Sequence, residues 1–456
     1  MNTKSLLIAL GILSFLGTLL FTGASNHLYN ASALAGLMIY FWIFELVPIY
    51  VTALLPLVLA IPLGVLGKEE LALSYGDSNV YLFFGGFILA LGLEKWGVHE
   101  QIARRIIKVV GNSKPRILLG FLISTGILSM WISNTATALM MLPMAMAIIE
   151  ALPAHQRREK FSVFLLLSVA YASSIGGVAT LIGSPPNLQM AGTLEGSFGV
   201  KIDFVEWMTI GLPISIAMII ATFSFFYMMM GKERLEVHAD LKLERKAWTN
   251  DQKKVLAIFS MVVFLWSFKD LLVPVLGFSY RDESAAILGG ILLFLLPSSQ
   301  EKKKLLDWKD TEKIPWGILI MFGGGLALAE MMEKNGVMIE IAKLFAGLDG
   351  YSYFSLLVVV VVLAVFASEV LSNLAMVSIF VPLIGKIALD LGLPAEDLAI
   401  PLTLGASLAF MMPIGTPPNA IVFSSGYLHV GQMVRYGFVL NIIGIILMVL
   451  FSWILL

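Results

Sequence analysis

Apolar runs long enough to cross a lipid bilayer recur along this chain from its first residues to its last. One of them, 5–22, carries no charge over its whole length, and a helix of about 20 apolar residues spans a hydrocarbon core about 30 Å thick. Charged residues make up 13% of the 456 residues, about half of the usual share in soluble domains. The sequence therefore predicts an all-α polytopic membrane protein. The apolar stretches lie at 5–22, 33–66, 80–97, 117–153, 161–193, 204–230, 255–276, 284–297, 314–333, 354–385, 399–425 and 432–456.

Several classes of function are excluded or disfavoured by composition. The chain has no cysteine, which excludes disulfides, thiolate metal sites and thiol catalysis. A formal net charge of −1 gives no basis for a nucleic-acid partner. Only Lys4 precedes the first apolar run, and no small-residue cleavage site follows it, so we expect a retained helix and not a signal peptide.

The stretch 117–153 begins and ends beside clusters of basic residues. Basic residues mark cytoplasmic loops, so both ends are expected on the same side and the segment must turn back within the membrane. Its midpoint is Ser133-Asn134-Thr135. Polar backbone at that depth is tolerated where it faces protein or water, which favours a hairpin tip that lines a binding site. The flanking basic residues are Arg104, Arg105, Lys108, Lys114 and Arg116 on one side, and Arg157, Arg158 and Lys160 on the other.

A charge count tests the resulting topology. With hairpins at 117–153 and 354–385 and single crossings elsewhere, the chain makes about eleven crossings, with the N-terminus in the cytoplasm and the C-terminus outside. This topology places inside Lys4 and the loops 98–116, 154–160, 231–254 and 298–315, which carry 21 Lys and Arg, whereas the outside loops carry six. This bias supports the orientation under the positive-inside rule.

The sequence also contains an internal repeat. Shifting the chain by 239 residues matches nine of sixteen positions between 83–98 and 322–337, and the same shift pairs Ser133-Asn134 with Ser372-Asn373. A shift of 232 pairs 183–187 with 415–419, each with two consecutive prolines. Equivalent spans are an odd number of crossings apart, which predicts two inverted repeats, an organisation typical of secondary transporters. The predicted units are a first transmembrane helix at 1–32, repeat 1 at 33–254 and repeat 2 at 255–456.

Each repeat thus supplies a Ser-Asn hairpin tip and a helix interrupted by proline. Pro185-Pro186 and Pro417-Pro418 are each expected to start a new half-helix, because proline suits the first helical turn. Helix N-termini favour anions. Carbonyls at the breaks, together with Ser and Asn side chains, offer oxygen ligands for a small cation such as sodium.

Other polar and small residues are weaker candidates for a binding role. A single Ser-Asn pair in a membrane helix is more often a contact between helices, but matched pairs in two repeats favour function. Glu369 lies beside the second tip, and its counterpart in repeat 1 is Met130; a ligand role and a structural role remain equally open. The glycines at 85–86 and 323–325 are interpreted as close-packing positions.

These motifs resemble the divalent-anion/sodium symporter family, the INDY-type carriers of dicarboxylates, citrate or sulfate. The resemblance extends over nearly the whole chain and rests on four motifs in order. It implies a homodimer in the lipid bilayer that moves its transport domain by an elevator mechanism. The motifs are Ser133-Asn134-Thr135, Leu181-Ile182-Gly183-Ser184-Pro185-Pro186-Asn187, Ser372-Asn373 and Gly415-Thr416-Pro417-Pro418-Asn419-Ala420.

The resemblance also implies ligand residues. Sodium is implied as the co-transported ion, with no organic cofactor. The first sodium site is implied at Ser129, Ser133, Asn134 and Gly183, and the second at Ser368, Leu371, Asn373 and Gly415. The substrate site is implied at Asn134, Thr135, Asn373, Leu374, Thr416 and Pro417. Members of the family usually have Thr or Val at the position of Leu374. Where they have Thr, the resemblance implies a hydroxyl that faces one end of the anion, and Leu374 lacks this hydroxyl.

The predicted function is sodium-coupled import of a C4-dicarboxylate such as succinate, malate or fumarate across a bacterial inner membrane. A sodium-independent dicarboxylate exchanger, or a sulfate or citrate transporter on the same fold, remains open. An anion channel is a more distant alternative. No pair of nucleophile and base is evident within the spans, so an enzyme is not expected.

Overall fold

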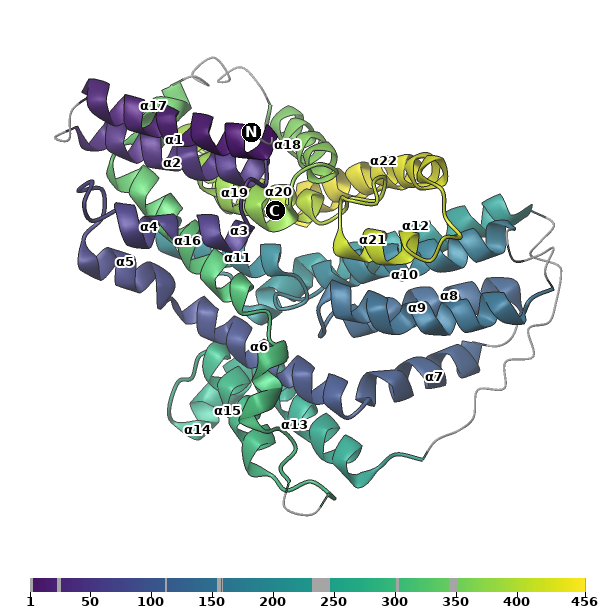
Figure 1. Cartoon of the computed structure of the whole chain (residues 1–456). Helices are drawn as coiled ribbons and strands as arrows, with labels where there is room; N and C mark the ends of the chain where they lie inside the picture. Colours follow the sequence, from purple (N-terminus) through teal and green to yellow (C-terminus); the bar gives the residue numbers. More distant parts are fainter. Residues whose placement is uncertain are drawn as a thin grey trace.

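The computed structural model describes residues 3–22, 26–110, 113–153, 157, 159–231, 247–300, 303–343 and 352–455. Regular structure in these ranges is almost entirely helical (Figure 1). The helices are α1 (Thr3–Thr22), α2 (His27–Ile43), α3 (Ile49–Thr52), α4 (Leu55–Leu59), α5 (Lys68–Tyr75), α6 (Ser78–Lys95), α7 (Val98–Val110), α8 (Lys114–Ser129), α9 (Asn134–Ala151), α10 (Lys160–Val178), α11 (Pro185–Phe198), α12 (Phe204–Met230), α13 (Asn250–Ser267), α14 (Lys269–Leu276), α15 (Asp282–Leu295), η2 (Trp308–Lys313), α16 (Trp316–Lys334), α17 (Val337–Lys343), α18 (Tyr353–Ser368), α19 (Asn373–Asp390), α20 (Glu396–Ala406), α21 (Pro417–Phe423) and α22 (Val430–Leu455).

Seven helical stretches within the described residues are long and apolar enough to cross a membrane. Shorter apolar helices lie at Ile49–Leu59, Asn134–Glu150 and Tyr353–Ser368. The prediction of an all-helical polytopic membrane protein is therefore confirmed. The seven stretches are Thr3–Leu20, Lys68–Lys95, Lys160–Val178, Phe204–Met230, Trp316–Lys334, Asn373–Asp390 and Val430–Leu455.

A pair of helices joined by a short turn lies at each of the two stretches that the sequence predicts as hairpins. Helices α8 and α9 pack against each other, and the turn between them covers residues 130–133 (Figure 1). Ser133 is the N-cap of α9 and accepts a hydrogen bond from the Ala136 N–H at 3.2 Å. Helices α18 and α19 form the second pair, with Ser372 as the N-cap of α19. The two Ser-Asn motifs therefore start the second helix of each hairpin.

The two proline pairs lie where the sequence predicts a helix break. Helix α10 ends at Val178 and α11 begins at Pro185, while α20 ends at Ala406 and α21 begins at Pro417. Every residue from Phe161 to Val178 is buried, so α10 forms the centre of the molecule. Two unwound segments, 179–184 and 407–416, result from these breaks, and their backbone groups need partners outside a helix.

The charged segment 98–116, which the sequence predicts as a loop, is largely helical. Most of it forms α7, which starts directly after Gly97, a residue with φ of 64°. Val98 and Ala103 are buried, whereas Glu100 and Arg105 are exposed. The segment is an amphipathic helix, because its apolar residues recur at helical spacing along one side.

The repeat places a second helix in the corresponding position. Helix α17 follows Gly336, whose φ is 76°. The lysine two residues before each glycine forms an ion pair, Lys95 with Asp310 and Lys334 with Glu70. These contacts hold the ends of α6 and α16 to the opposite half of the chain. The predicted loop 231–254 lies largely outside the described residues.

Close packing at the two glycine clusters is confirmed. A Cβ at Gly85 would lie 2.6 Å from the Ala286 side chain, and one at Gly324 would lie 2.4 Å from the Ala53 carbonyl oxygen. Only hydrogen fits at either position, so α6 approaches α15 and α16 approaches α3 through these glycines.

Candidate functional site

The unwound segments lie against the hairpin turns of the same half. In the first half, the Thr180 hydroxyl donates to the Met130 carbonyl in the turn of the first hairpin. In the second half, Glu369 in the turn of the second hairpin accepts bonds from residues 410–412. The halves also interlock, since α9 packs against α21 and α11 packs against α19. Four polar motifs that are far apart in sequence are thus built into one region.

The first hairpin turn gathers several oxygen atoms around Ser129. Its buried hydroxyl lies 2.7 Å from Asn134 Oδ1 and 2.6 Å from the Ser173 carbonyl oxygen. A serine hydroxyl has one proton, so it can satisfy only one of these two acceptors at a time. The Ser129 hydroxyl, Asn134 Oδ1 and the Ser173 carbonyl oxygen thus form a cluster of oxygen atoms of the kind that a small cation prefers. Of the residues implied for the first sodium site, Ser129 and Asn134 are therefore in direct contact.

Two glycines allow this approach. A Cβ at Gly177 would lie 2.4 Å from Asn134 Oδ1, and one at Gly183 would lie 2.7 Å from the Gly177 carbonyl oxygen. Gly183 also lies close to Met130, where an added Cβ would be 3.1 Å from the carbonyl oxygen. Gly183 is consequently packed against the hairpin turn, as a backbone ligand of the first site would have to be. Sequence analysis did not include Gly177.

The remaining polar residues of this turn have different environments. The Ser133 hydroxyl serves as an acceptor for the start of α9. Thr135, in the first turn of α9, is partly exposed, as is Asn134. These two side chains are therefore accessible to a ligand, unlike the buried Ser129.

The second hairpin turn has related chemistry with different pairing. Ser368 donates to the Val365 carbonyl oxygen of its own helix at 2.8 Å and so makes no bond to Asn373. Asn373 Oδ1 is buried and has no hydrogen-bond partner among the described residues. A buried acceptor without a donor is unfavourable in the absence of a ligand. Its environment fits a cation. Leu371, two residues before Asn373, is partly exposed. Gly415 is also partly exposed and lies against Glu369 of the same hairpin turn.

The anchor of each unwound segment is an asparagine that sequence analysis quoted but did not count as a site residue. Asn187 Nδ2 donates to the Gly177 and Thr180 carbonyl oxygens, each at 2.9 Å. Asn419 Nδ2 donates to the Ala409 and Met412 carbonyl oxygens, each at 3.0 Å. Because both are fully buried, they fix the shape of the two breaks. The repeated Pro-Pro-Asn sequence was the signal for this role.

The residues implied for the anion lie at the edges of these breaks. Thr416 is buried and caps α21 by accepting a bond from the Asn419 N–H at 3.3 Å. Pro417 is exposed at the first position of α21. Leu374 is 7% exposed and packs in a cluster of apolar side chains with α2 and α16. Its side chain therefore contributes to helix packing beside the second tip.

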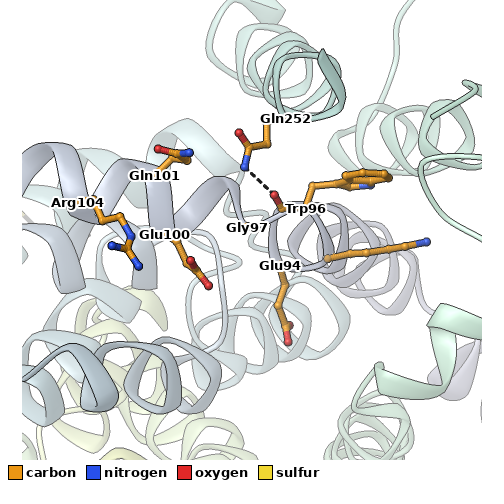
Figure 2. A pocket seen from close by; sticks show the side chains of 8 residues that line it. Glu94, Trp96, Gly97, Glu100, Gln101, Arg104 and Gln252 are labelled. Carbon is orange, nitrogen blue, oxygen red and sulfur yellow. Dashed lines mark hydrogen bonds between the residues drawn. The ribbon is translucent and has the colours of Figure 1, made fainter. Parts of the chain in front are cut away.

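A separate cavity of about 290 Å³ lies where α6 meets α7. Figure 2 shows Gln252 donating to the Trp96 carbonyl oxygen beside it, at 2.9 Å. The cavity contains none of the Ser-Asn or Pro-Pro residues. It is lined by Glu94, Lys95, Trp96, Gly97, Glu100, Gln101, Arg104 and Gln252.

Paired hairpins and broken helices around buried amides and hydroxyls define this molecule as a membrane transporter and not an enzyme. The chain belongs to the sodium:sulfate symporter family, because the family model described as "Sodium:sulfate symporter transmembrane region" matches residues 5–456. The family resemblance expected from the four motifs is confirmed.

Curated relatives and solved structures agree with this assignment. The sodium-dependent dicarboxylate transporter SdcS of Staphylococcus saprophyticus is 36% identical over 428 residues, which cover 90% of this chain and 82% of the relative. SdcS of Staphylococcus aureus is 35% identical over 474 residues, which cover 97% and 89%.

Among solved structures, the YdaH transporter of Alcanivorax borkumensis has a TM-score of 0.61 at 14% identity and covers 92% of this chain and 98% of its own. Neisseria gonorrhoeae MtrF, described with a class of antimetabolite efflux pumps, has a TM-score of 0.61 at 12% identity, with 85% and 82% covered. At these identities, the two structures support the fold alone.

Proposed function

We propose that this protein is a secondary transporter that imports C4-dicarboxylates together with sodium. The observation that carries the proposal is the pair of Ser-Asn hairpin turns, each set against an unwound segment. The first turn brings Ser129 Oγ, Asn134 Oδ1 and the Ser173 carbonyl oxygen together, and the second holds the buried Asn373 Oδ1, which has no partner among the described residues. The names of the SdcS relatives support both the ion and the substrate class.

The sodium ions are proposed to bind at the two hairpin turns. Sodium prefers hard oxygen ligands, which hydroxyls, amide oxygens and freed carbonyls supply. The contact between Ser129 and Asn134 and the unpartnered Asn373 Oδ1 support this assignment. The proposed ligands are Ser129, Ser133, Asn134 and Gly183 at the first site, and Ser368, Leu371, Asn373 and Gly415 at the second.

The dicarboxylate is proposed to bind between the two sodium ions. The helix starts at Asn134 and Asn373 present backbone N–H groups of the first turn, and such groups attract carboxylates. Helix α21 starts with two prolines, which have no N–H, so Pro417 would contact the anion only through its ring. Thr135 and Thr416 would add hydroxyl donors. Bound sodium would offset the two negative charges, so that the site needs no buried Lys or Arg, which would be unfavourable within a membrane.

Transport is proposed to follow an elevator mechanism in an inverted-repeat protein. The matching hairpins and breaks of 33–254 and 255–456, and the positive-φ glycines Gly97 and Gly336 before α7 and α17, support the repeat. The charge bias supports about eleven crossings, with the N-terminus in the cytoplasm, the C-terminus outside and the protein in the inner membrane of a bacterium. A homodimer is proposed as the working unit.

Uptake of labelled succinate into proteoliposomes tests this function. We expect uptake with an inward sodium gradient and none with matched potassium or choline. Asn134→Ala and Asn373→Ala should both abolish it. Wild-type uptake that is unaffected by replacing sodium would contradict symport, and dependence on internal dicarboxylate would then identify an exchanger.

The family name and Leu374 favour a second candidate substrate, sulfate. Leu374 offers no hydroxyl to the second end of a dicarboxylate, and sulfate is shorter than succinate. Competition identifies the substrate: unlabelled malate should reduce succinate uptake, whereas inhibition by sulfate alone would reassign the substrate.

A further inference from the structure

A buried carboxylate distinguishes the second half of the site from the first. Glu369 follows α18 and is 4% exposed. Its Oε1 accepts bonds from the Phe410 N–H at 2.8 Å, the Met411 N–H at 2.9 Å and Asn441 Nδ2 at 2.7 Å. Its Oε2 accepts from the Met412 N–H at 2.9 Å. All four partners are donors, so the group is an acceptor only, as an ionised carboxylate is.

This charge has no cationic partner in the part of the chain that the structure describes. None of the ion pairs there includes Glu369. The four donors reduce the unfavourable energy of burial, but they do not neutralise the charge. An uncompensated charge inside a membrane protein is unfavourable and often has a functional role.

The carboxylate adjoins the second proposed sodium site. A Cβ at Gly415 would lie 3.2 Å from Glu369 Oε2. Glu369 also follows Ser368 directly and precedes Leu371 by two residues. A sodium ion held by Gly415 and Leu371 would therefore lie close to a full negative charge, in surroundings where screening by water is weak.

The first half has no such charge. The shift that relates the hairpins places Met130 at the position of Glu369. There the link to the unwound segment is a neutral bond from the Thr180 hydroxyl to the Met130 carbonyl. The hairpin turn is thus linked to the unwound segment by a neutral hydrogen bond in the first half and by a charged carboxylate in the second.

We propose that Glu369 is a positioning residue that makes the two sodium sites unequal. The second site binds sodium tightly before the anion arrives, because a permanent negative charge is already present. The first site lacks that charge and fills only when the dicarboxylate supplies one. The proposal rests on the proposed function, since it assigns an order of binding within the same two sites.

Thermal unfolding of the purified protein, without dicarboxylate, tests the order of binding. An ion that binds only the folded state raises the midpoint temperature of unfolding. Sodium should raise the midpoint of the wild type relative to potassium or choline at equal ionic strength. In Glu369→Gln the shift should vanish or require at least about tenfold more sodium, whereas Ser129→Ala at the first site should retain it.

Asn441→Ala is the matched structural control. It removes one donor to Glu369 and leaves the negative charge in place. It should lower the midpoint in every salt and keep the sodium-specific shift. Equal loss of that shift in Asn441→Ala and Glu369→Gln would mean that Glu369 only supports the backbone, and an undiminished shift in Glu369→Gln would also overturn the proposal.

Equilibrium binding of radioactive sodium to the wild type provides a test that needs no variant. We expect one sodium ion per chain without anion and a second once succinate is present. Binding of both ions without succinate, or of neither, would overturn the order. Failure of the proposed function would be seen separately, as wild-type uptake that does not require sodium.

Discussion

Asn419 makes the same pair of hydrogen bonds in the second half of the molecule as Asn187 makes in the first. The acceptors of Asn187 are the carbonyls of residues 177 and 180, and those of Asn419 are the carbonyls of residues 409 and 412. All three pairs of positions differ by 232 residues, the shift that aligns the Pro-Pro-Asn motifs. The repeat is therefore preserved in individual hydrogen bonds within the unwound segments.

Replacing either asparagine should damage the break that it supports. Asn187→Ala and Asn419→Ala each remove two hydrogen bonds. The Thr180 and Met412 carbonyls keep a second donor, the N–H of Gly183 or Gly415, whereas the Gly177 and Ala409 carbonyls lose the asparagine donor, at about 1–3 kcal/mol for a buried unpaired group. We expect a lower unfolding midpoint and at least about a tenfold loss of sodium-dependent uptake. Ser452→Ala is a suitable control, because that buried hydroxyl has no hydrogen-bond partner among the described residues; similar losses in the control would contradict the assignment.

A methyl group at Gly177 should disturb the first site selectively. In Gly177→Ala the Cβ would lie 2.4 Å from Asn134 Oδ1, so the Asn134 side chain must move. We expect the sodium concentration for half-maximal uptake to rise by about tenfold or uptake to be lost. Gly196→Ala on α11 meets nothing within 4 Å and should transport normally. Unchanged sodium dependence in Gly177→Ala would argue against Asn134 as a ligand.

The ion pair before α7 gives a prediction on pH. Burial alone would raise the pKa of Asp310, but the bond from Lys95 at 2.6 Å and the Asp307 N–H lower the pKa below its ordinary value. A carboxyl group with a lowered pKa stabilises the folded state above its unfolded pKa of about 4, and this stabilisation is lost as the pH falls through the lowered value.

Asp310→Asn should therefore lower the stability by about 1 kcal/mol or less, as for other partly exposed pairs. Thermal unfolding should show the same difference from the wild type throughout pH 5.5–8, and a smaller difference below about pH 4. A difference that disappears near neutral pH would contradict the direction of the pKa shift.

The sequence predicted the local breaks well because their causes are local. Prolines at 185 and 417 start helices wherever they occur in such a segment, and Ser133 caps a helix through its own neighbours. The partners of Glu369 could not be predicted in this way, since they lie 41 to 72 residues further along the chain. Their positions depend on how α18, α20 and α22 pack.

Helix α7 was missed for a different reason. Counting charges treats 98–116 as a polar segment, whereas the spacing of Val98 and Ala103 on one side, with Glu100 and Arg105 on the other, indicates an amphipathic helix. The charge count indicates on which side of the membrane a segment lies, whereas the periodicity indicates whether the segment is helical. Only the periodicity distinguishes a loop from an amphipathic helix.

Leu374→Thr should lower the stability of the folded protein and add a contact with the substrate. Leu374 is 7% exposed among apolar side chains of α2 and α16, so replacing it with a smaller, polar residue should lower the stability by about 1–3 kcal/mol. If the hydroxyl reaches the anion, the KM for succinate should fall while the KM for sodium at saturating succinate stays nearly constant. Labelled uptake measures both constants, and Leu374→Val serves as the control because it shortens the side chain without adding a hydroxyl. A similar change in the succinate KM for both variants would mean that residue 374 acts through helix packing, and that the anion is held by Asn373 and Thr416 without a third side chain from this tip.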